Sequence, residues 1–310
     1  MMRAAVIDRF GGPDKIKVRE TPVPRPKANE VLIRVSTAGV GTWDAYFRSG
    51  DIKTAHDFPL VLGTDGSGVV VDAGRRVTRF KKGDRVYAYV WDGGFYAEYV
   101  TVAANSAGHV PKGLSLQSAG ALGVVGLTAL QGVDDALKLR RGESVIVHGA
   151  SGNVGMIAVQ LAKWRGARVI ATASGRDGVA FVRRLGIENV IDGKKGDVEV
   201  AARELAPDGV DAVLAFAGGE ELIRCIDTLR KGGRVVYPNG IDPAPRKRKH
   251  IRVSSYNAVA SPEKFAALNR AVIGSKLKVP IEKSVPLARA ADAHRRLERG
   301  HLLGRIVIKP

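Results

Sequence analysis

A glycine-rich turn at residues 149–155 has the residue types and spacing to bind a pyrophosphate. It reads GASGNVG, so Gly149 and Ala150 stand where the usual G-x-G-x-x-G pattern has its first glycine. Gly152 lets the backbone approach an anion, and Gly155 permits close packing of a helix on a sheet. A position between a strand and a helix favours a dinucleotide site over a tight turn without a ligand. The expected contacts come from Ser151, Gly152, Asn153 and Val154.

The end of the next predicted strand indicates which nucleotide binds. NAD-binding units usually place Asp or Glu there, about 20 residues past the glycines, to hold the ribose 2′-hydroxyl. This chain has Ser174 and Arg176 instead, a hydroxyl and a guanidinium that can bind a 2′-phosphate. The alternative is that Arg176 is a solvated residue beside Asp177. The pattern therefore predicts NADP(H) as the cofactor.

These residues must be positioned by a β-α-β unit. Ser144–His148 is a Val- and Ile-rich run typical of a buried parallel strand. Apolar residues at helical spacing follow from Val154, and Gly166 ends that helix. Arg168–Thr172 is the second strand. The chain then alternates helices and strands as a doubly wound sheet does: helix Gly178–Leu185, strand Asn189–Ile191, helix Val198–Leu205, strand Val210–Ala215, helix Glu220–Leu229 and strand Gly233–Tyr237.

The two ends of the chain have a different pattern. Strands are expected at Ala4–Ile7, Ile16–Arg19 and Glu30–Ser36, separated by glycine- and proline-rich turns. Near the C-terminus, a helix at Leu287–Arg299 precedes a strand at Arg305–Lys309. A β-rich domain formed from both ends is therefore expected beside the dinucleotide domain.

Composition and charge narrow the class of protein. The chain has 310 residues, of which 45% are hydrophobic, and this suits about two globular domains. It has no apolar run of about 18 residues and no signal-peptide pattern, so a cytoplasmic location without a membrane partner is expected. The single cysteine, Cys225, excludes an intramolecular disulfide and a cysteine-rich zinc lobe, and is expected in the core.

The net charge of +18 favours contact with polyanions. Part of the excess lies in the basic run Arg246–Arg252, which reads RKRKHIR. Such a run can bind nucleic acid. It lacks interleaved aromatic residues, so a solvated loop is the preferred interpretation.

Four blocks ahead of the dinucleotide unit carry a family resemblance. They are Ala38–Gly50 (AGVGTWDAYFRSG), Leu60–Val71, Lys82–Val86 and Gly93–Val100. With these blocks in this order, the chain resembles the medium-chain dehydrogenase/reductase superfamily, and within it the zinc-independent quinone oxidoreductases related to zeta-crystallin. The resemblance implies an α/β protein with a GroES-like catalytic domain at residues 1–122 and 261–310. A Rossmann NADP-binding domain at residues 123–260 is inserted between these parts.

The resemblance also bears on metal chemistry. Zinc-dependent members have a Cys at the position of Gly41, a His at Thr64 and often a third ligand near Val124. Gly, Thr and Val supply no such ligand, and the six histidines show no metal-ligand spacing, so no metal site is expected. The implied reaction is NADPH-dependent hydride transfer to an electron-poor acceptor, a quinone or an α,β-unsaturated carbonyl.

Further site residues come from the resemblance alone. Tyr46 is the expected catalytic donor to the substrate oxygen, with a packed aromatic as the alternative. Trp43 either narrows the substrate pocket or packs on the core. Thr128 is expected beside the nicotinamide, Asn239 and Gly240 beside the pyridine nucleotide, and Ala217 near the adenosine. Gly193 replaces the Tyr or His with which relatives stack on the adenosine.

Two alternatives concern partners. A binding protein with little turnover, whose basic surface takes RNA or another polyanion, is the second functional hypothesis. The resemblance further implies a homodimer formed by an edge strand near Ile251–Ser255.

Overall fold

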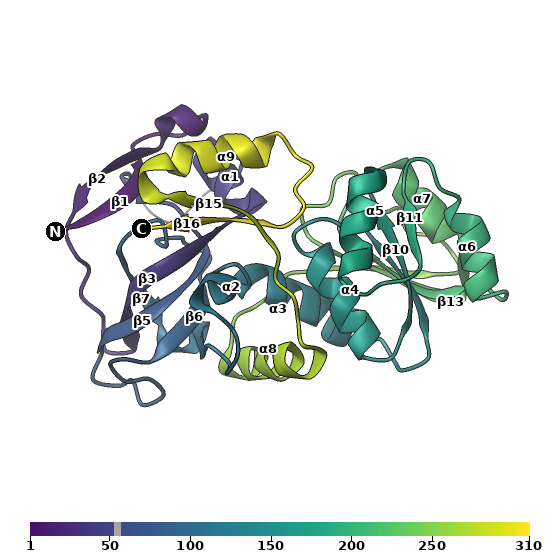
Figure 1. The fold of residues 1–310 in the computed structure, drawn as a ribbon, viewed down its shortest axis with the longest axis horizontal. Helices are drawn as coiled ribbons and strands as arrows, with labels where there is room; N and C mark the ends of the chain where they lie inside the picture. Colours follow the sequence, from purple (N-terminus) through teal and green to yellow (C-terminus); the bar gives the residue numbers. More distant parts are fainter. Residues whose placement is uncertain (53–56) are drawn as a thin grey trace. The chain divides into compact units, whose positions relative to one another are not determined.

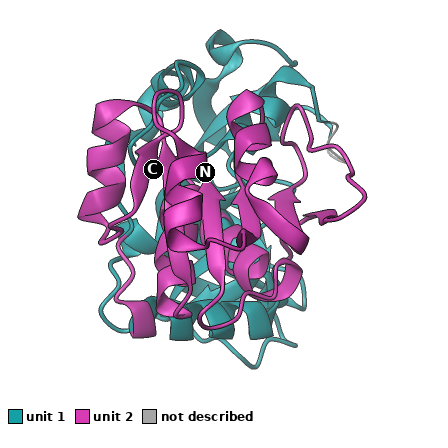
Figure 2. Ribbon diagram, turned by 90° about the vertical axis from the view of Figure 1, so that its right-hand side faces the viewer, with its two compact units in different colours: residues 1–124, 260–273, 279–310 teal, residues 125–259, 274–278 magenta. Residues whose placement is uncertain are grey.

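The computed structural model describes residues 1–52 and 57–310, which form two compact units (Figure 1). The first unit contains residues 1–124, 260–273 and 279–310, and the second contains residues 125–259 and 274–278 (Figure 2). The predicted fold class, a β-rich unit and a doubly wound α/β unit, is confirmed. None of the helices in the described part of the chain has the length and apolar composition needed to cross a membrane.

The second unit is built on a parallel sheet. Its strands lie in the order β11 (Val190–Asp192), β10 (Arg168–Ala173), β9 (Ser144–His148), β12 (Val210–Ala215), β13 (Leu229–Pro238) and β14 (Arg252–Tyr256). Its helices are α3 (Gly123–Gln131), which begins at the boundary of the units, α4 (Gly155–Trp164), α5 (Gly175–Arg184), α6 (Val198–Leu205) and α7 (Glu220–Asp227). Ile146, Ile170 and Val213 are fully buried in its core. The strand order reverses between β9 and β12, where open parallel sheets bind ligands at their carboxyl ends.

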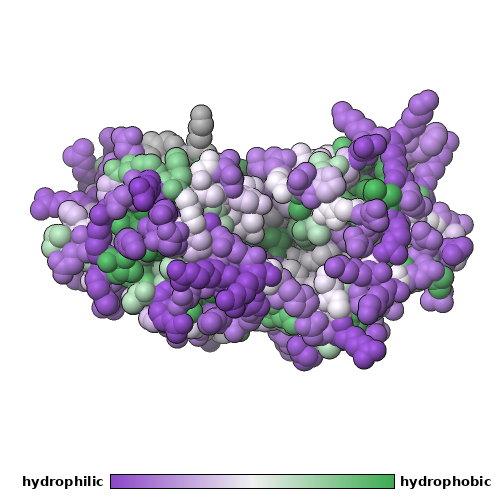
Figure 3. All heavy atoms as spheres, turned by 90° about the horizontal axis from the view of Figure 1, so that it is seen from above, coloured by the Kyte–Doolittle hydropathy of each residue, from purple (hydrophilic) through white to green (hydrophobic). Residues whose placement is uncertain are grey.

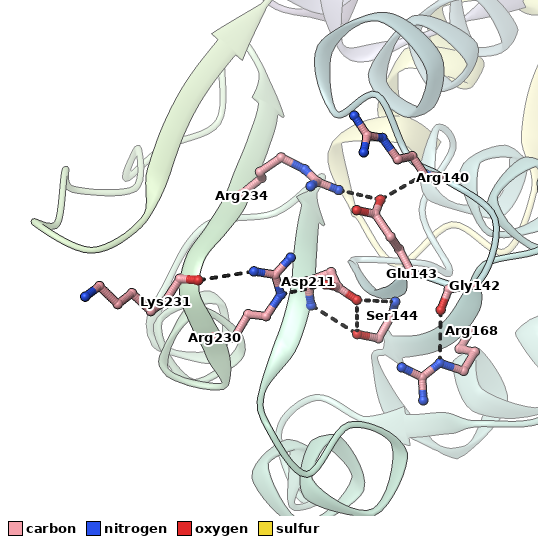
Figure 4. Close-up of polar contacts among 9 residues, drawn as sticks. All are labelled: Arg140, Gly142, Glu143, Ser144, Arg168, Asp211, Arg230, Lys231 and Arg234. Atoms are coloured by element: carbon pink, nitrogen blue, oxygen red, sulfur yellow. Dashed lines mark hydrogen bonds and ion pairs between the residues drawn. The ribbon is translucent and has the colours of Figure 1, made fainter.

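Polar contacts link neighbouring strands near their amino ends (Figure 4). Glu143 accepts a hydrogen bond from Arg234 at 2.6 Å. Asp211 accepts bonds of 2.8 Å from both the N–H and the hydroxyl of Ser144, and one of 2.7 Å from Arg230. These contacts join β9, β12 and β13 at the edge opposite the carboxyl ends, so their role is structural.

The first unit contains two sheets. In the larger one the order is β15 (Ile281–Pro286), β16 (Arg305–Lys309), β3 (Glu30–Val40), β5 (Asp65–Ala73), β6 (Arg85–Tyr89) and β8 (Ala107–His109), with β7 (Tyr99–Ala103) also paired to β3. The smaller has β2 (Lys17–Thr21), β1 (Met2–Ile7) and β4 (Leu60–Val61). The helices are α1 (Thr42–Ser49), α2 (Leu116–Gly120), α8 (Pro262–Ser275, whose last two residues belong to the second unit) and α9 (Ala290–Glu298).

Several predicted boundaries differ from the structure. The strand predicted to end at Ser36 continues to Val40, because β16 pairs with its second half through Ile306 and Val40. The helix predicted from Gly178 begins at Gly175. The helix predicted from Leu287 begins as a 3-10 turn and becomes α-helical at Ala290.

The charged surface includes the basic run. Residues 246–250 of the run are exposed and precede β14 without forming a helix or strand, which agrees with the preferred interpretation as a solvated loop. Arg248 forms an ion pair with Asp227. Hydrophilic side chains cover much of the molecular face in Figure 3.

Candidate functional site

The turn between β9 and α4 is shaped as an anion site. Gly149 has a φ of +76°, a conformation that glycine adopts without strain. A Cβ on Gly155 would lie 2.2 Å from the Gly149 carbonyl oxygen, so only glycine fits there. Among the described residues, the N–H groups of Asn153 and Val154 have no hydrogen-bond partner, and the buried Oδ1 of Asn153 has none either. The two backbone N–H groups are donors that fit a pyrophosphate.

Two residues at the end of β10 could bind a 2′-phosphate. Ser174 is the N-cap residue of α5, yet its exposed side chain caps no N–H group. Arg176 is exposed and has no hydrogen bond or ion pair with a described residue. Its expected alternative neighbour, Asp177, accepts the N–H of Gly178 at 2.9 Å. Both polar groups are therefore available to a ligand.

Arg176 lines a cavity of about 540 Å³ between α5 and β11. Arg183 and Arg184 also line it, and so does Asp192 at the end of β11. Asp192 accepts an N–H from Lys194 at 3.2 Å. Sequence reasoning considered only the end of β10 and missed this carboxylate, although Asp192 directly follows a predicted strand. The cavity therefore combines three cations that attract a phosphate with one anion that repels it.

The remaining predicted cofactor residues lie on the same unit. Ala217 follows β12, and Asn239 and Gly240 follow β13; all three are exposed at the carboxyl edge of the sheet. Thr128, on α3, is 8% exposed, and its carbonyl accepts the hydroxyl of Tyr256 at 2.8 Å. The parallel sheet thus brings the strand-end residues, from Ser151 to Gly240, to one edge. Thr128 lies on α3, which the hydrogen bond from Tyr256 joins to β14.

The side chains of His148 and Thr172 form a buried pair that supports the glycine-rich turn. The Nδ1 of His148 lies 2.8 Å from the hydroxyl of Thr172, which also accepts the N–H of Gly149 at 3.3 Å. Burial lowers the pKa of His148, which keeps the ring neutral. Cys225 is 1% exposed, and burial raises its pKa to about 12, so the thiol stays protonated in the core as expected. No sequence pattern singled out His148 as a support for the turn.

The predicted donor Tyr46 belongs to the first unit, where it joins an aromatic cluster. We define this cluster as Trp43, Tyr46, Phe47 and Trp91. The Trp43 ring lies 5.8 Å from Tyr46 and 5.5 Å from Trp91, whose ring lies 5.1 Å from Phe47. Trp91 is 44% exposed. The Tyr46 hydroxyl donates to none of the residues that the structure describes.

An ionic cluster of Asp44, Asp65 and Arg305 is buried in the same unit. All three are at most 1% exposed. The Arg305 guanidinium lies 3.1 Å from the Asp65 carboxylate and donates to the carbonyls of Val40 at 3.0 Å and Ala121 at 3.1 Å. Burial, and next the Asp65 charge, raise the pKa of Asp44 to about 7. Burial also raises the pKa of Asp65, against the opposing effect of Arg305.

The carboxylates of this ionic cluster accept backbone hydrogen bonds from the three positions at which zinc-dependent enzymes have their metal ligands. The N–H groups of Gly41 and Thr64 donate to Asp44 at 2.8 and 2.9 Å, and the N–H of Val124 donates to Asp65 at 3.1 Å. Within residues 1–52 and 57–310, no three His, Cys, Asp or Glu side chains are grouped to hold a metal ion. His56, one of the six histidines, lies outside the described residues.

Comparison with known proteins places this geometry in a family. A model of the alcohol dehydrogenase GroES-like domain matches residues 27–112, and a model described as zinc-binding dehydrogenase matches residues 185–308. The quinone oxidoreductase of Mus musculus is 32% identical over 314 residues, covering 97% of this chain and 95% of that protein.

Two solved structures resemble the whole chain. The crystal structure of an NAD-dependent alcohol dehydrogenase has a TM-score of 0.92 at 30% identity, with all of both chains covered. The quinone oxidoreductase of Escherichia coli, complexed with NADPH, has a TM-score of 0.89 at 25% identity, covering 99% of this chain and 100% of that one.

Proposed function

Since the chain belongs to the quinone oxidoreductases of the medium-chain dehydrogenase/reductase superfamily, we propose that it reduces quinones or α,β-unsaturated carbonyls with NADPH and without a metal ion. The family makes it an NAD(P)H-dependent oxidoreductase. We choose NADPH because of the residues at the end of β10. The side chains of Ser174 and Arg176 there have no hydrogen-bond partner among the residues that the structure describes. A phosphate group satisfies both.

The second unit supplies the nucleotide contacts. The N–H groups of Asn153 and Val154 bind the pyrophosphate, and the guanidinium of Arg176 binds the 2′-phosphate by charge-assisted hydrogen bonds. Thr128, Ala217, Asn239 and Gly240 are proposed to line the rest of the nucleotide. A bound nicotinamide supplies the hydride.

The first unit supplies the acceptor contacts. The Tyr46 hydroxyl donates a hydrogen bond to the substrate oxygen, on which negative charge develops as hydride adds. Trp43 and the half-exposed Trp91 favour flat, ring-shaped acceptors by aromatic stacking. Gly41, Thr64 and Val124 supply neither thiolate nor imidazole, which supports hydride transfer without zinc.

We expect the protein to oxidise NADPH when given 1,4-benzoquinone or 9,10-phenanthrenequinone, with a kcat of at least about 1 s⁻¹. The readout is loss of nicotinamide absorbance at ~340 nm, a property of the cofactor itself. Dialysis against EDTA should leave the rate unchanged, because no ligand set for zinc is present at positions 41, 64 and 124.

A simple enone and a primary alcohol with NADP⁺ complete the assay. Turnover of the alcohol together with inactivation by EDTA would reject the metal-free mechanism. Tight NADPH binding without turnover of any acceptor would reject the enzyme hypothesis. It would favour the second hypothesis, a binding protein with little turnover.

The proposed assembly is a homodimer through β14. Among the described residues this strand pairs only with β13, and its other edge carries backbone groups that a second copy can pair. The exposed basic run directly precedes it.

A further inference from the structure

We propose that the first unit binds a small oligophosphate in a pocket distinct from the acceptor residues. This arginine pocket has a volume of about 250 Å³ and is lined by Lys283, Arg289, Asp292, Arg295, Arg296 and Arg299. Lys283 comes from β15, and the other residues come from α9 and its two ends. None of the predicted nucleotide or substrate residues lines it.

The arginine pocket carries uncompensated positive charge. Five cationic side chains line it, and two carboxylates pair with them: Asp292 inside the pocket and Glu282 beside Arg296. This leaves three positive charges. Lys283 and Arg299 form no ion pair or hydrogen bond with any residue that the structure describes. Charges of one sign in a concave site repel each other and concentrate counter-ions.

Three of the four arginines already have protein partners. Asp292 accepts from Arg289 at 2.6 Å through Nε and from Arg295 at 2.8 Å through Nη1, so each guanidinium retains further N–H donors. Arg296 is fixed by Glu282 at 2.5 Å and by the Gly300 carbonyl at 2.9 Å. Because these side chains are ordered before an anion arrives, binding loses less conformational entropy.

Helix electrostatics explain only part of this cluster. Arg295, Arg296 and Arg299 lie in or just after the last turn of α9, where cations are favourable. Arg289 is at the N-cap, where a cation is unfavourable, and Lys283 is on a strand. The ion pair with Asp292 compensates Arg289, whereas Lys283 has no partner among the described residues, and an anion bound in the pocket would supply one.

Size and charge identify the class of anion. Pockets for drug-sized ligands measure roughly 300–1,000 Å³, so this one suits a small anion or one end of a larger molecule. A phosphate monoester carries about −1.5 to −2 charges at neutral pH, so two linked phosphoryl groups match three positive charges better than one. Both a free pyrophosphate and the diphosphate end of a nucleotide have this chemistry.

The test is calorimetric titration of the full chain, saturated with NADPH, separately with pyrophosphate, with ADP and with a single-stranded oligonucleotide. The variant Lys283→Gln/Arg299→Gln removes two unpaired cations and leaves no carboxylate without its partner. Arg75→Gln/Arg76→Gln is the matched control, because it removes two exposed cations elsewhere on the same unit.

We expect the pocket variant to weaken binding of pyrophosphate, ADP or both by about tenfold or more, and the control to change it less than about twofold. Which ligand responds distinguishes the free oligophosphate from the nucleotide end. Absence of pyrophosphate and ADP binding would overturn the proposal, and so would equal weakening in both variants. Binding of a single-stranded oligonucleotide alone would replace it with an extended polyanion surface.

Discussion

Replacing Arg305 with Met should destabilise the protein by about 3–5 kcal/mol, because it leaves Asp65 as a buried carboxylate without its cation. Two backbone carbonyls, of Val40 and Ala121, also lose their donor. Urea denaturation measures the change.

The loss of folding stability in Arg305→Met should depend on pH. Burial already holds the folded-state pKa of Asp65 above its value of 3.8, and loss of Arg305 raises it further. A carboxyl whose folded pKa is raised binds more protons when folded, so its contribution to stability falls as pH rises from the unfolded towards the folded pKa. The variant should therefore lose more stability at pH 8 than at pH 5, relative to wild type.

Arg305→Met/Asp65→Asn is the control for this prediction. The double variant removes both charges of the Arg305–Asp65 pair, and the Asn oxygen can still accept the N–H of Val124, so it should recover about half or more of the lost stability. A single variant as stable as wild type would show that the ionic cluster does not hold the first unit together.

Replacing Gly155 with Ala should weaken NADPH binding by about a hundredfold or more. The new Cβ would lie 2.2 Å from the Gly149 oxygen and 2.8 Å from Ala150 Cα, so the turn must open. The N–H groups of Asn153 and Val154 then lose their alignment with the phosphate, and two hydrogen bonds to a charged group at about 1.5 kcal/mol or more each correspond to about a hundredfold or more in affinity.

Fluorescence titration with NADPH measures this loss. Gly178→Ala is the matched control, because a Cβ there has its nearest contact, with the Ser151 side chain, at an ordinary 3.4 Å, and its φ is not positive. Thermal denaturation of both variants separates loss of binding from loss of folding. Unchanged NADPH affinity in a folded Gly155→Ala variant would contradict the placement of the pyrophosphate at this turn.

Local patterns were enough to predict the second unit. Runs of Val and Ile with glycine turns between them mark β9, β10 and β12, and their common parallel direction brings the strand-end residues to one edge. The ends of elements were less predictable. β3 continues past Ser36 because β5 pairs with Thr37 and Ala38, and it reaches Val40 beside β16, a strand more than 260 residues later.

The ionic cluster could not be predicted for the same reason. Asp44, Asp65 and Arg305 are far apart in sequence, and each alone has the pattern of a solvated charge. They meet because β16 lies beside β3 and β3 beside β5. Trp91 was missed because it sits in a turn after β6, where no periodicity marks a functional aromatic. The sequence left open whether Trp43 narrows the substrate pocket or packs on the core. In the structure it contacts Tyr46 and Trp91 as well as the core.

The choice between the two nicotinamide nucleotides depends on opposing charges. Arg176 favours a 2′-phosphate, whereas Asp192 lines the same cavity and opposes one. The solved relatives include both an NAD-dependent enzyme and one complexed with NADPH.

The most direct test of the proposed function is therefore kcat/KM for NADPH and for NADH with one quinone, in wild type and in Arg176→Ala. We expect wild type to prefer NADPH by about tenfold or more. The variant should lose about 10- to 100-fold with NADPH, the range for one hydrogen bond to a charged group, and less than about twofold with NADH. Equal use of both nucleotides by wild type, or equal losses with both in the variant, would contradict the assignment of Arg176 and of NADPH.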